Sequence, residues 1–272
     1  MRRLLFSLLL ATVAHGQVDQ NKPFPPHKVA GNVYYVGSET LATFLITTPE
    51  GNILINSDFE ATVPVIRAAV EKLGFKFSDT KILLGSHAHG DHMQGDALIK
   101  EYTGAQVMAM EQDVPALRAM RPGGKEHPID RVLKDGDKVT LGGTTLTAHL
   151  TPGHTPGCTT WSLQTTEAGR QLDVVIVCSV GVNANYVLVN NTNYPQIADD
   201  YRKSFAKLRG MKADIFLGAH GAFYGLTAKY AELEKGGGAN PFIDPGALGA
   251  YVDRMEQAFN TRLREQQQGK AK

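Results

Sequence analysis

The hydrophobic and polar positions of the chain follow two periods. Stretches rich in β-branched and aromatic residues, bounded by glycine, proline or asparagine, predict strands. We expect strands at residues 32–37, 42–48, 53–56, 81–85, 105–110, 138–141, 145–150, 158–164, 174–178 and 214–218. Apolar residues at helical spacing predict helices at residues 63–73, 95–102, 112–120, 196–208, 227–235 and 245–267.

The order of these elements predicts the fold class. Strands dominate each half of the chain and each half ends in helices, which indicates an α+β fold of two stacked sheets with helices outside. The apolar run at 174–178 predicts a strand buried on both faces. No repeat or linker divides the sequence, so we expect a single domain over residues 17–272, with a proline-rich extended arm at 21–27 near its start.

Composition and charge argue against some classes of binding partner. The 272 residues are 42% hydrophobic and carry a formal net charge of +1, without a basic cluster. Nucleic acid and anionic membranes are therefore not expected as partners. We expect a monomer that acts on a small molecule.

The first 16 residues have the pattern of a signal peptide. Arg2 and Arg3 precede an apolar run at 4–13, and the small residues Ala14 and Gly16 follow at the two positions critical for cleavage. That run is too short to anchor the protein in a bilayer. The sequence predicts export to the periplasm or the medium, with no membrane association after the leader is removed.

Cys158 and Cys178 are the two cysteines of the chain. In an exported protein a pair of cysteines favours a disulfide. Two buried free thiols are the alternative, because the sequence gives no geometry.

A cluster of potential metal ligands lies directly after the expected strand at 81–85. His87, His89, Asp91 and His92 fall within six residues, bracketed by glycines. Imidazole and carboxylate groups are the ligands that zinc prefers. Residues two apart in an extended segment point the same way, so His87 and His89 can hold one ion while Asp91 and His92 turn towards a second.

Two more histidines occupy similar positions, where a strand gives way to a glycine-containing loop. His154 lies in the loop Pro152 to Gly157, and His220 precedes Gly221. With the first four residues they make six ligands, enough for two zinc ions with open positions. The remaining histidines are interpreted as leader, loop or packed residues: His15, His27, His127 and His149.

The pattern His-X-His-X-Asp-His, followed by Gly-His-X-X-Gly and a strand-end histidine, resembles the metallo-β-lactamase superfamily. The resemblance covers residues 30–265 and implies an αβ/βα four-layer sandwich. Many hydrolases of the superfamily place a bridging aspartate where this chain reads Val177-Cys178-Ser179-Val180. His92 and Ser179 together resemble subclass B3 of the metallo-β-lactamases.

The resemblance implies roles for individual residues. His87, His89 and His154 would hold the first of two Zn²⁺ ions, and Asp91, His92 and His220 the second. A zinc-bound hydroxide would hydrolyse the β-lactam amide of penicillins, cephalosporins and carbapenems without a covalent intermediate, conferring resistance. Asp91 would orient the hydroxide and Ser179 a water.

Some members hold the substrate carboxylate with a serine at the position of Gly181. Here Asn183, Asn185, Tyr194 or Ser179 would take over this contact. Alternation along a strand predicts that Cys178 points away from the metals, towards Cys158. Some members carry that disulfide.

Two alternatives stay open. Another dizinc hydrolase of the same fold would act on a lactone, thioester or small ester, which the altered anchor at Gly181 allows. A zinc-binding scaffold without activity is disfavoured, since structural zinc sites are normally single and closed.

Overall fold

The computed structural model describes residues 20–270, so the predicted leader lies outside the described residues. Its first sheet has seven strands in chain order. The early strands pair antiparallel, whereas β4 to β7 run parallel to one another. The strands are β1 (His27–Ala30), β2 (Val33–Tyr35), β3 (Phe44–Thr48), β4 (Gly51–Ile55), β5 (Thr80–Leu84), β6 (Gln106–Met110) and β7 (Arg131–Leu133).

The second sheet has five strands and is antiparallel except at one edge, where β11 and β12 are parallel. Its spatial order is β12 (Ile215–Gly218), β11 (Arg170–Val177), β10 (Thr159–Glu167), β9 (Thr144–Leu150) and β8 (Lys138–Leu141).

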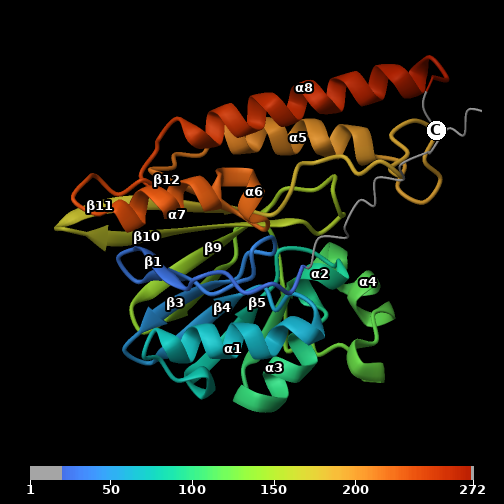
Figure 1. Ribbon diagram of the computed structural model, residues 1–272. Coiled ribbons are helices and arrows are strands. Elements are labelled where there is room, and N and C mark those ends of the chain that lie inside the picture. Colours follow the sequence, from blue (N-terminus) through green and yellow to red (C-terminus); the bar gives the residue numbers. More distant parts are fainter. Residues whose placement is uncertain (1–19, 271–272) are drawn as a thin grey trace, which may run out of the picture.

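Helices cover the outer face of each sheet, which completes the predicted four-layer sandwich (Figure 1). The first half contributes α1 (Val63–Lys72), α2 (Gly90–Met93), α3 (Asp96–Thr103) and α4 (Val114–Ala119). The second half contributes α5 (Ile197–Arg209), α6 (Gly221–Tyr224), α7 (Leu226–Lys235) and α8 (Ala247–Gln267). Among the described residues no helix is long and apolar enough to cross a membrane.

Alternation along the strands of the first sheet explains the layers. In β4, Ile53 and Ile55 point into the core between the two sheets, whereas Leu54 packs under α1. In β5, Leu84 likewise points into the core between the sheets, and Leu83 points towards the outer helices. Both faces are covered, so the last three residues of β4 and of β5 are all apolar. The run Val174–Val177 of β11 is buried as predicted.

Several boundaries differ from the prediction. β1 and β7 are too short to give a periodic signal, and the expected helix at 112–120 divides into a 3₁₀ turn at 111–113 followed by α4. β11 begins at Arg170 and ends at Val177. Because the polar residues at its start lie at an exposed hairpin end, hydrophobicity did not mark them as strand.

Candidate metal centre

The predicted ligands lie where strands of both sheets end. Asn56, directly after β4, fixes the start of the first ligand loop. Its side-chain oxygen accepts the Ser86 N–H at 2.9 Å, and its amide group donates to the Ala42 carbonyl at 3.0 Å. Its φ of 68° is left-handed, which asparagine tolerates better than most residues. The chain then turns through His87 to His89 and enters α2 at Gly90.

The first group of ligands joins this loop to the loop between β9 and β10. His87, His89 and His154 each offer a donor atom, and the three atoms lie within 4.8 Å of one another. The Nε2 atom of His87 is 3.0 Å from the Nδ1 atom of His89. His154 donates its Nδ1–H to the Gly181 carbonyl at 2.8 Å, which leaves Nε2 as the free lone pair.

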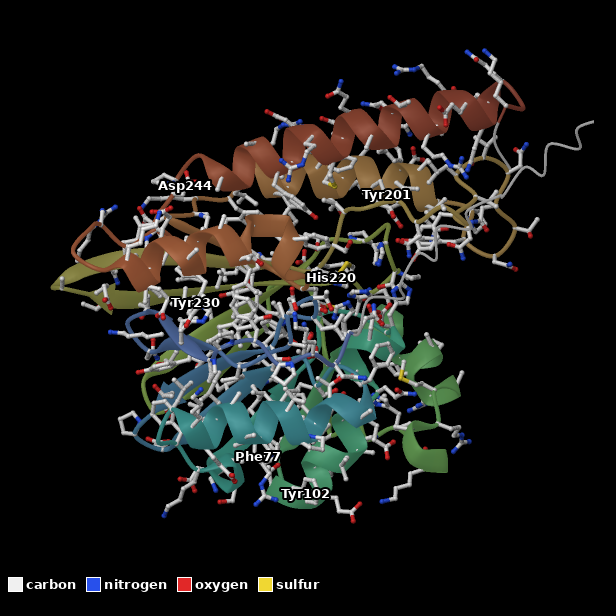
Figure 2. The ribbon with its side chains drawn as sticks, in the orientation of Figure 1. Phe77, Tyr102, Tyr201, His220, Tyr230 and Asp244 are labelled. Carbon is white, nitrogen blue, oxygen red and sulfur yellow. A yellow bond between two sulfur atoms is a disulfide. The ribbon has the colours of Figure 1, made fainter. Side chains whose placement is uncertain are left out.

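The second group combines α2 with the residue after β12. The Nε2 atoms of His92 and His220 are 3.2 Å apart, and Oδ2 of Asp91 is 3.3 Å from the first and 3.7 Å from the second. A tetrahedral ion with bonds of 2.0–2.1 Å separates its ligands by about 3.3 Å. The three atoms therefore fit around one ion. Figure 2 shows His220 in the middle of the molecule, between the two helical layers.

The electrostatics of the cluster also fit a cation. Burial lowers the pKa of His87 and of His92 well below the ordinary value, and neighbouring imidazoles lower both further. Burial lowers the pKa of His154 to about 4, against the effect of its bond to Gly181. Burial also lowers the pKa of His220, although Asp91 opposes the shift. Neutral imidazoles with converging lone pairs are the form that binds metal.

A family model for the metallo-β-lactamase superfamily matches residues 40–220, which include all six residues. The chain belongs to this superfamily. Superfamily proteins of known structure are similar over nearly the whole chain. The FEZ-1 metallo-β-lactamase from Legionella gormanii is 50% identical with a TM-score of 0.87, covering 90% of this chain and 98% of that one. BJP-1 from Bradyrhizobium japonicum, a subclass B3 metallo-β-lactamase, is 41% identical with a TM-score of 0.86, covering 93% and 98%.

Curated relatives in the superfamily match a shorter part. Hydroxyacylglutathione hydrolase from Cereibacter sphaeroides is 37% identical over 94 residues, which are 35% of this chain and 32% of that protein. The enzyme of the same name from Hyphomonas neptunium is 35% identical over 117 residues, 43% and 41% of the two chains. The chain thus matches well under half the length of these relatives. The chain is a superfamily hydrolase, and the superfamily fold implies a divalent metal.

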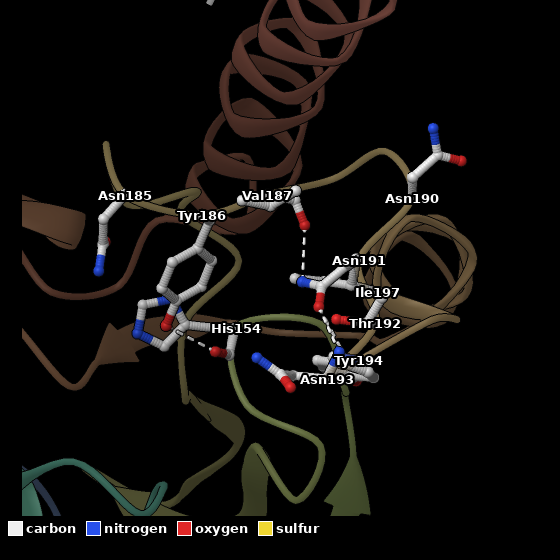
Figure 3. Close-up of a pocket in the computed structure, with 10 residues that line it drawn as sticks. All are labelled: His154, Asn185, Tyr186, Val187, Asn190, Asn191, Thr192, Asn193, Tyr194 and Ile197. Carbon is white, nitrogen blue, oxygen red and sulfur yellow. Dashed lines mark hydrogen bonds between the residues drawn. The ribbon is translucent and has the colours of Figure 1, made fainter. Parts of the chain in front are cut away.

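The residues predicted to hold substrate are dispersed. Asn185 and Tyr194 line a pocket of about 360 Å³ that also includes His154 (Figure 3), whereas Asn183 is exposed outside it. The hydroxyl of Tyr194 donates to Asp200 at 2.9 Å, so it is already engaged. The Ser179 hydroxyl is buried and accepts the Gly181 N–H at 3.3 Å.

Sequence reasoning missed Tyr186. Its hydroxyl donates to the His154 carbonyl at 2.8 Å and lies 3.3 Å from Nε2 of His89, and its ring packs on His154 (Figure 3). Burial raises the pKa of Tyr186 to about 12, so the phenol stays protonated at neutral pH. A lone tyrosine in an irregular loop gives no periodic or motif signal.

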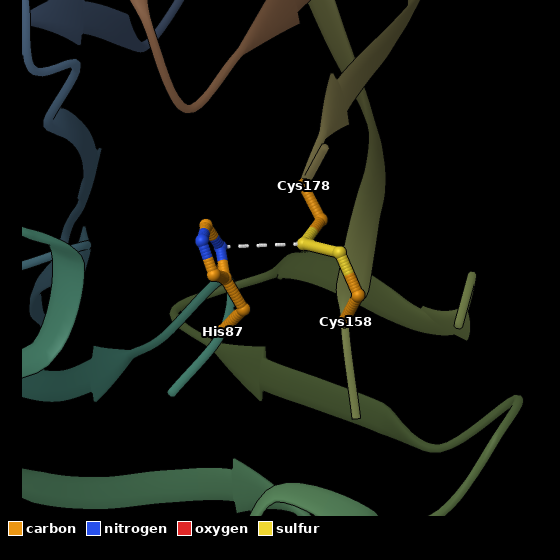
Figure 4. A group of neighbouring side chains, drawn as sticks. All are labelled: His87, Cys158 and Cys178. Atoms are coloured by element: carbon orange, nitrogen blue, oxygen red, sulfur yellow. Dashed lines mark hydrogen bonds between the residues drawn. A yellow bond between two sulfur atoms is a disulfide. The ribbon is translucent and has the colours of Figure 1, made fainter. Parts of the chain in front are cut away.

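Cys158 and Cys178 form a disulfide, with Cα atoms 5.8 Å apart. Cys178 points towards Cys158, as predicted, but it also packs against a predicted ligand of the first group. Its sulfur lies 3.4 Å from Nδ1 of His87, behind the ring (Figure 4). β11 ends at Val177, so strand alternation no longer applies at Cys178.

Sequence reasoning also interpreted His127 as an ordinary loop residue. It is buried, and its Nε2 lies 3.2 Å from Oδ2 of the buried Asp96. This ion pair ties the loop before β7 to the start of α3. His149 lies near the end of β9, belongs to neither ligand group, and contacts the Ser162 hydroxyl at 2.8 Å.

Proposed function

We propose that the chain is a zinc-dependent β-lactamase of the B3 type. The observation that carries the proposal is the likeness to the Legionella and Bradyrhizobium β-lactamases over nine-tenths or more of this chain and nearly all of theirs. The hydroxyacylglutathione hydrolases match only 32–41% of their own lengths. Likeness over a whole chain includes the second sheet and the loops that contact substrate.

The six ligands are assigned to two zinc ions. His87, His89 and His154 would hold the first, and Asp91, His92 and His220 the second. When bound, zinc supplies an activated water nucleophile at neutral pH and Lewis-acid polarisation of a carbonyl.

The chain's own residues supply the remaining functions. The Asp91 carboxylate, partly exposed beside the cluster, orients the attacking water. The Tyr186 hydroxyl, protonated beside His89, can turn from the His154 carbonyl and donate to the oxygen that gains charge. The hydroxyl of the buried Ser179 accepts the Gly181 N–H at 3.3 Å, and an amide N–H is not a base that could activate a nucleophile. No acyl-enzyme is expected.

The substrate groove is the pocket beside His154. Asn191 orders its wall: the side-chain oxygen accepts the N–H groups of Asn193 and Tyr194, and the amide group donates to the Val187 carbonyl. Asn185, exposed on the opposite side, remains the proposed contact for the substrate carboxylate.

Thioester hydrolysis is the second candidate, favoured by the match to the hydroxyacylglutathione hydrolases. The residues directly after β11 are Cys178 and Ser179 rather than a carboxylate, which argues against it. Export to the periplasm, proposed from Arg2, Arg3 and the apolar run that follows, agrees with a substrate met outside the cytoplasm.

The test is hydrolysis of a penicillin, a cephalosporin, a carbapenem and a hydroxyacylglutathione thioester by the zinc-loaded protein, with and without a chelator. We expect chelator-sensitive turnover of the β-lactams. Turnover of the thioester alone, with two zinc ions bound, would replace this proposal by the second candidate. Export is checked separately by fractionating cells that express the full chain.

A further inference from the structure

Asp113 connects the two loops that carry the first ligand group. Its side chain is buried, and its two oxygens accept three hydrogen bonds. Oδ2 accepts from the Ala88 N–H and the Thr155 hydroxyl, each at 2.8 Å, and Oδ1 accepts from the Gly157 N–H at 2.6 Å. Burial raises the pKa of Asp113, and these donors oppose the shift.

The donors of these three hydrogen bonds lie next to the predicted metal ligands. Ala88 lies between His87 and His89, and Thr155 directly follows His154. One carboxylate therefore bonds to backbone and side-chain groups adjoining all three ligands of the first group.

The helix after Asp113 does not use this side chain. Asp113 is the N-cap residue of α4, a position where aspartate usually accepts N–H groups of its own helix. Here its side chain makes no capping bond. The carboxylate is turned instead to the ligand loops.

Gly157 shows how close the contact is. A Cβ at residue 157 would lie 2.5 Å from the backbone nitrogen of Asp113 and 2.6 Å from its Cβ and Cγ. Only glycine permits this approach.

We propose that Asp113 is a positioning residue that sets the distance between the His87–His89 loop and the His154 loop, and thereby the affinity of the first metal site. This inference rests on the proposed zinc binding. His87 and His89 reach the site from the first sheet and His154 from the second. Apart from the metal, their separation depends on contacts such as this one.

The first variant is Asp113→Asn, which keeps the size of the side chain. An amide has one acceptor oxygen, so it can serve either Ala88 and Thr155 or Gly157, and its NH₂ group must face the remaining N–H. Loss of such supporting bonds typically weakens metal affinity by 10–100-fold. We expect Zn²⁺ to bind about 10–100-fold more weakly at the first site, and we expect the d–d spectrum of the Co²⁺-loaded protein to change.

Two further variants separate positioning from general destabilisation. Glu111 is exposed and lies two residues before Asp113. Glu111→Gln removes its charge and should leave Zn²⁺ affinity and the Co²⁺ spectrum unchanged. Thr155→Val removes one donor but leaves the carboxylate, so it should weaken the first site by less than Asp113→Asn. It also keeps the test valid if Asp113→Asn does not fold.

Zinc titration and urea unfolding of the metal-free proteins give the decisive comparison. Wild-type Zn²⁺ affinity and an unchanged Co²⁺ spectrum in Asp113→Asn and Thr155→Val, even with lower stability, would overturn the inference and leave Asp113 as a structural residue. Because these readouts use metal alone, they do not depend on which substrate the enzyme hydrolyses. A failure of β-lactam turnover would remove the proposed function and leave this result intact.

Discussion

At the scale of single residues, Gly181 shows that a position can matter through its backbone. The sequence draws attention to it because a side-chain hydroxyl is missing there. In the structure its carbonyl accepts both the Nδ1–H of His154 and the hydroxyl of Tyr201, each at 2.8 Å. The first bond fixes the tautomer of a predicted metal ligand, since it forces the remaining lone pair onto Nε2. A side-chain motif cannot reveal such a role.

The ligand assignment predicts the effect of His87→Ala. Removing this buried imidazole takes one of three donors from the first group, so we expect loss of one zinc per chain and a fall in β-lactam turnover of more than about 100-fold. Metal content and turnover measured on the same preparation check it. His149→Ala, a like substitution at a histidine outside both ligand groups, should retain two zinc ions and activity. Wild-type activity in His87→Ala would show that the assignment is wrong.

His127 predicts a dependence of stability on pH. Burial alone would lower the pKa of His127, but Asp96 and the carbonyls of Met93 and Pro128 outweigh it and raise that pKa. Its contribution to stability is therefore fully present below the ordinary histidine pKa of about 6.5 and is lost as pH rises through the folded-state value. His127→Gln should cost about 3 kcal/mol of unfolding free energy at pH 5.5 and less at pH 8.5. Urea unfolding of both proteins at the two pH values measures the difference, and a constant difference would contradict the ion-pair role.

At the scale of elements, the long strands and helices could be predicted from their apolar residues. A buried strand is apolar on both faces, and a surface helix carries one apolar stripe. α8 (Ala247–Gln267) and β5 (Thr80–Leu84) lie within two residues of their expected ends. At the strand ends, the sequence could predict which residue types would bind metal but not the contacts that these residues make. The pairing of Asp113 with Ala88 and the packing of Cys178 behind His87 arise where regular structure stops, and there sequence periodicity carries no information.

The disulfide belongs to this scale, since it joins the residue before β10 to the residue after β11. Closing a loop of this length restricts the unfolded chain and contributes about 3 kcal/mol. The double variant Cys158→Ala, Cys178→Ala should lose roughly that amount in urea unfolding. A thiol reductant should lower the stability of the wild type towards that of the variant and leave the variant unaffected. Equal stability of both proteins would show that the bridge is absent or dispensable in solution.

At the scale of the whole molecule, each ligand group draws on both halves of the sandwich. The first group takes His87 and His89 from the end of β5 and His154 from the loop between β9 and β10. The second takes Asp91 and His92 from α2 and His220 from the end of β12. A metal held by either group would therefore link the two sheets at one edge.

This arrangement predicts that chelation destabilises the fold. A ligand that binds the folded state contributes about 2.7 kcal/mol at a free concentration 100 times its dissociation constant, for each site. Removing zinc with a chelator should lower the unfolding free energy by about that amount per site, and added zinc should restore it. His220→Ala takes one of three donors from the second group alone, so zinc should stabilise this variant by roughly half as much as the wild type. The control His149→Ala should show the full effect. If zinc stabilises His220→Ala as much as the wild type, His220 does not hold metal; if chelation leaves every unfolding curve unchanged, metal does not join the two halves.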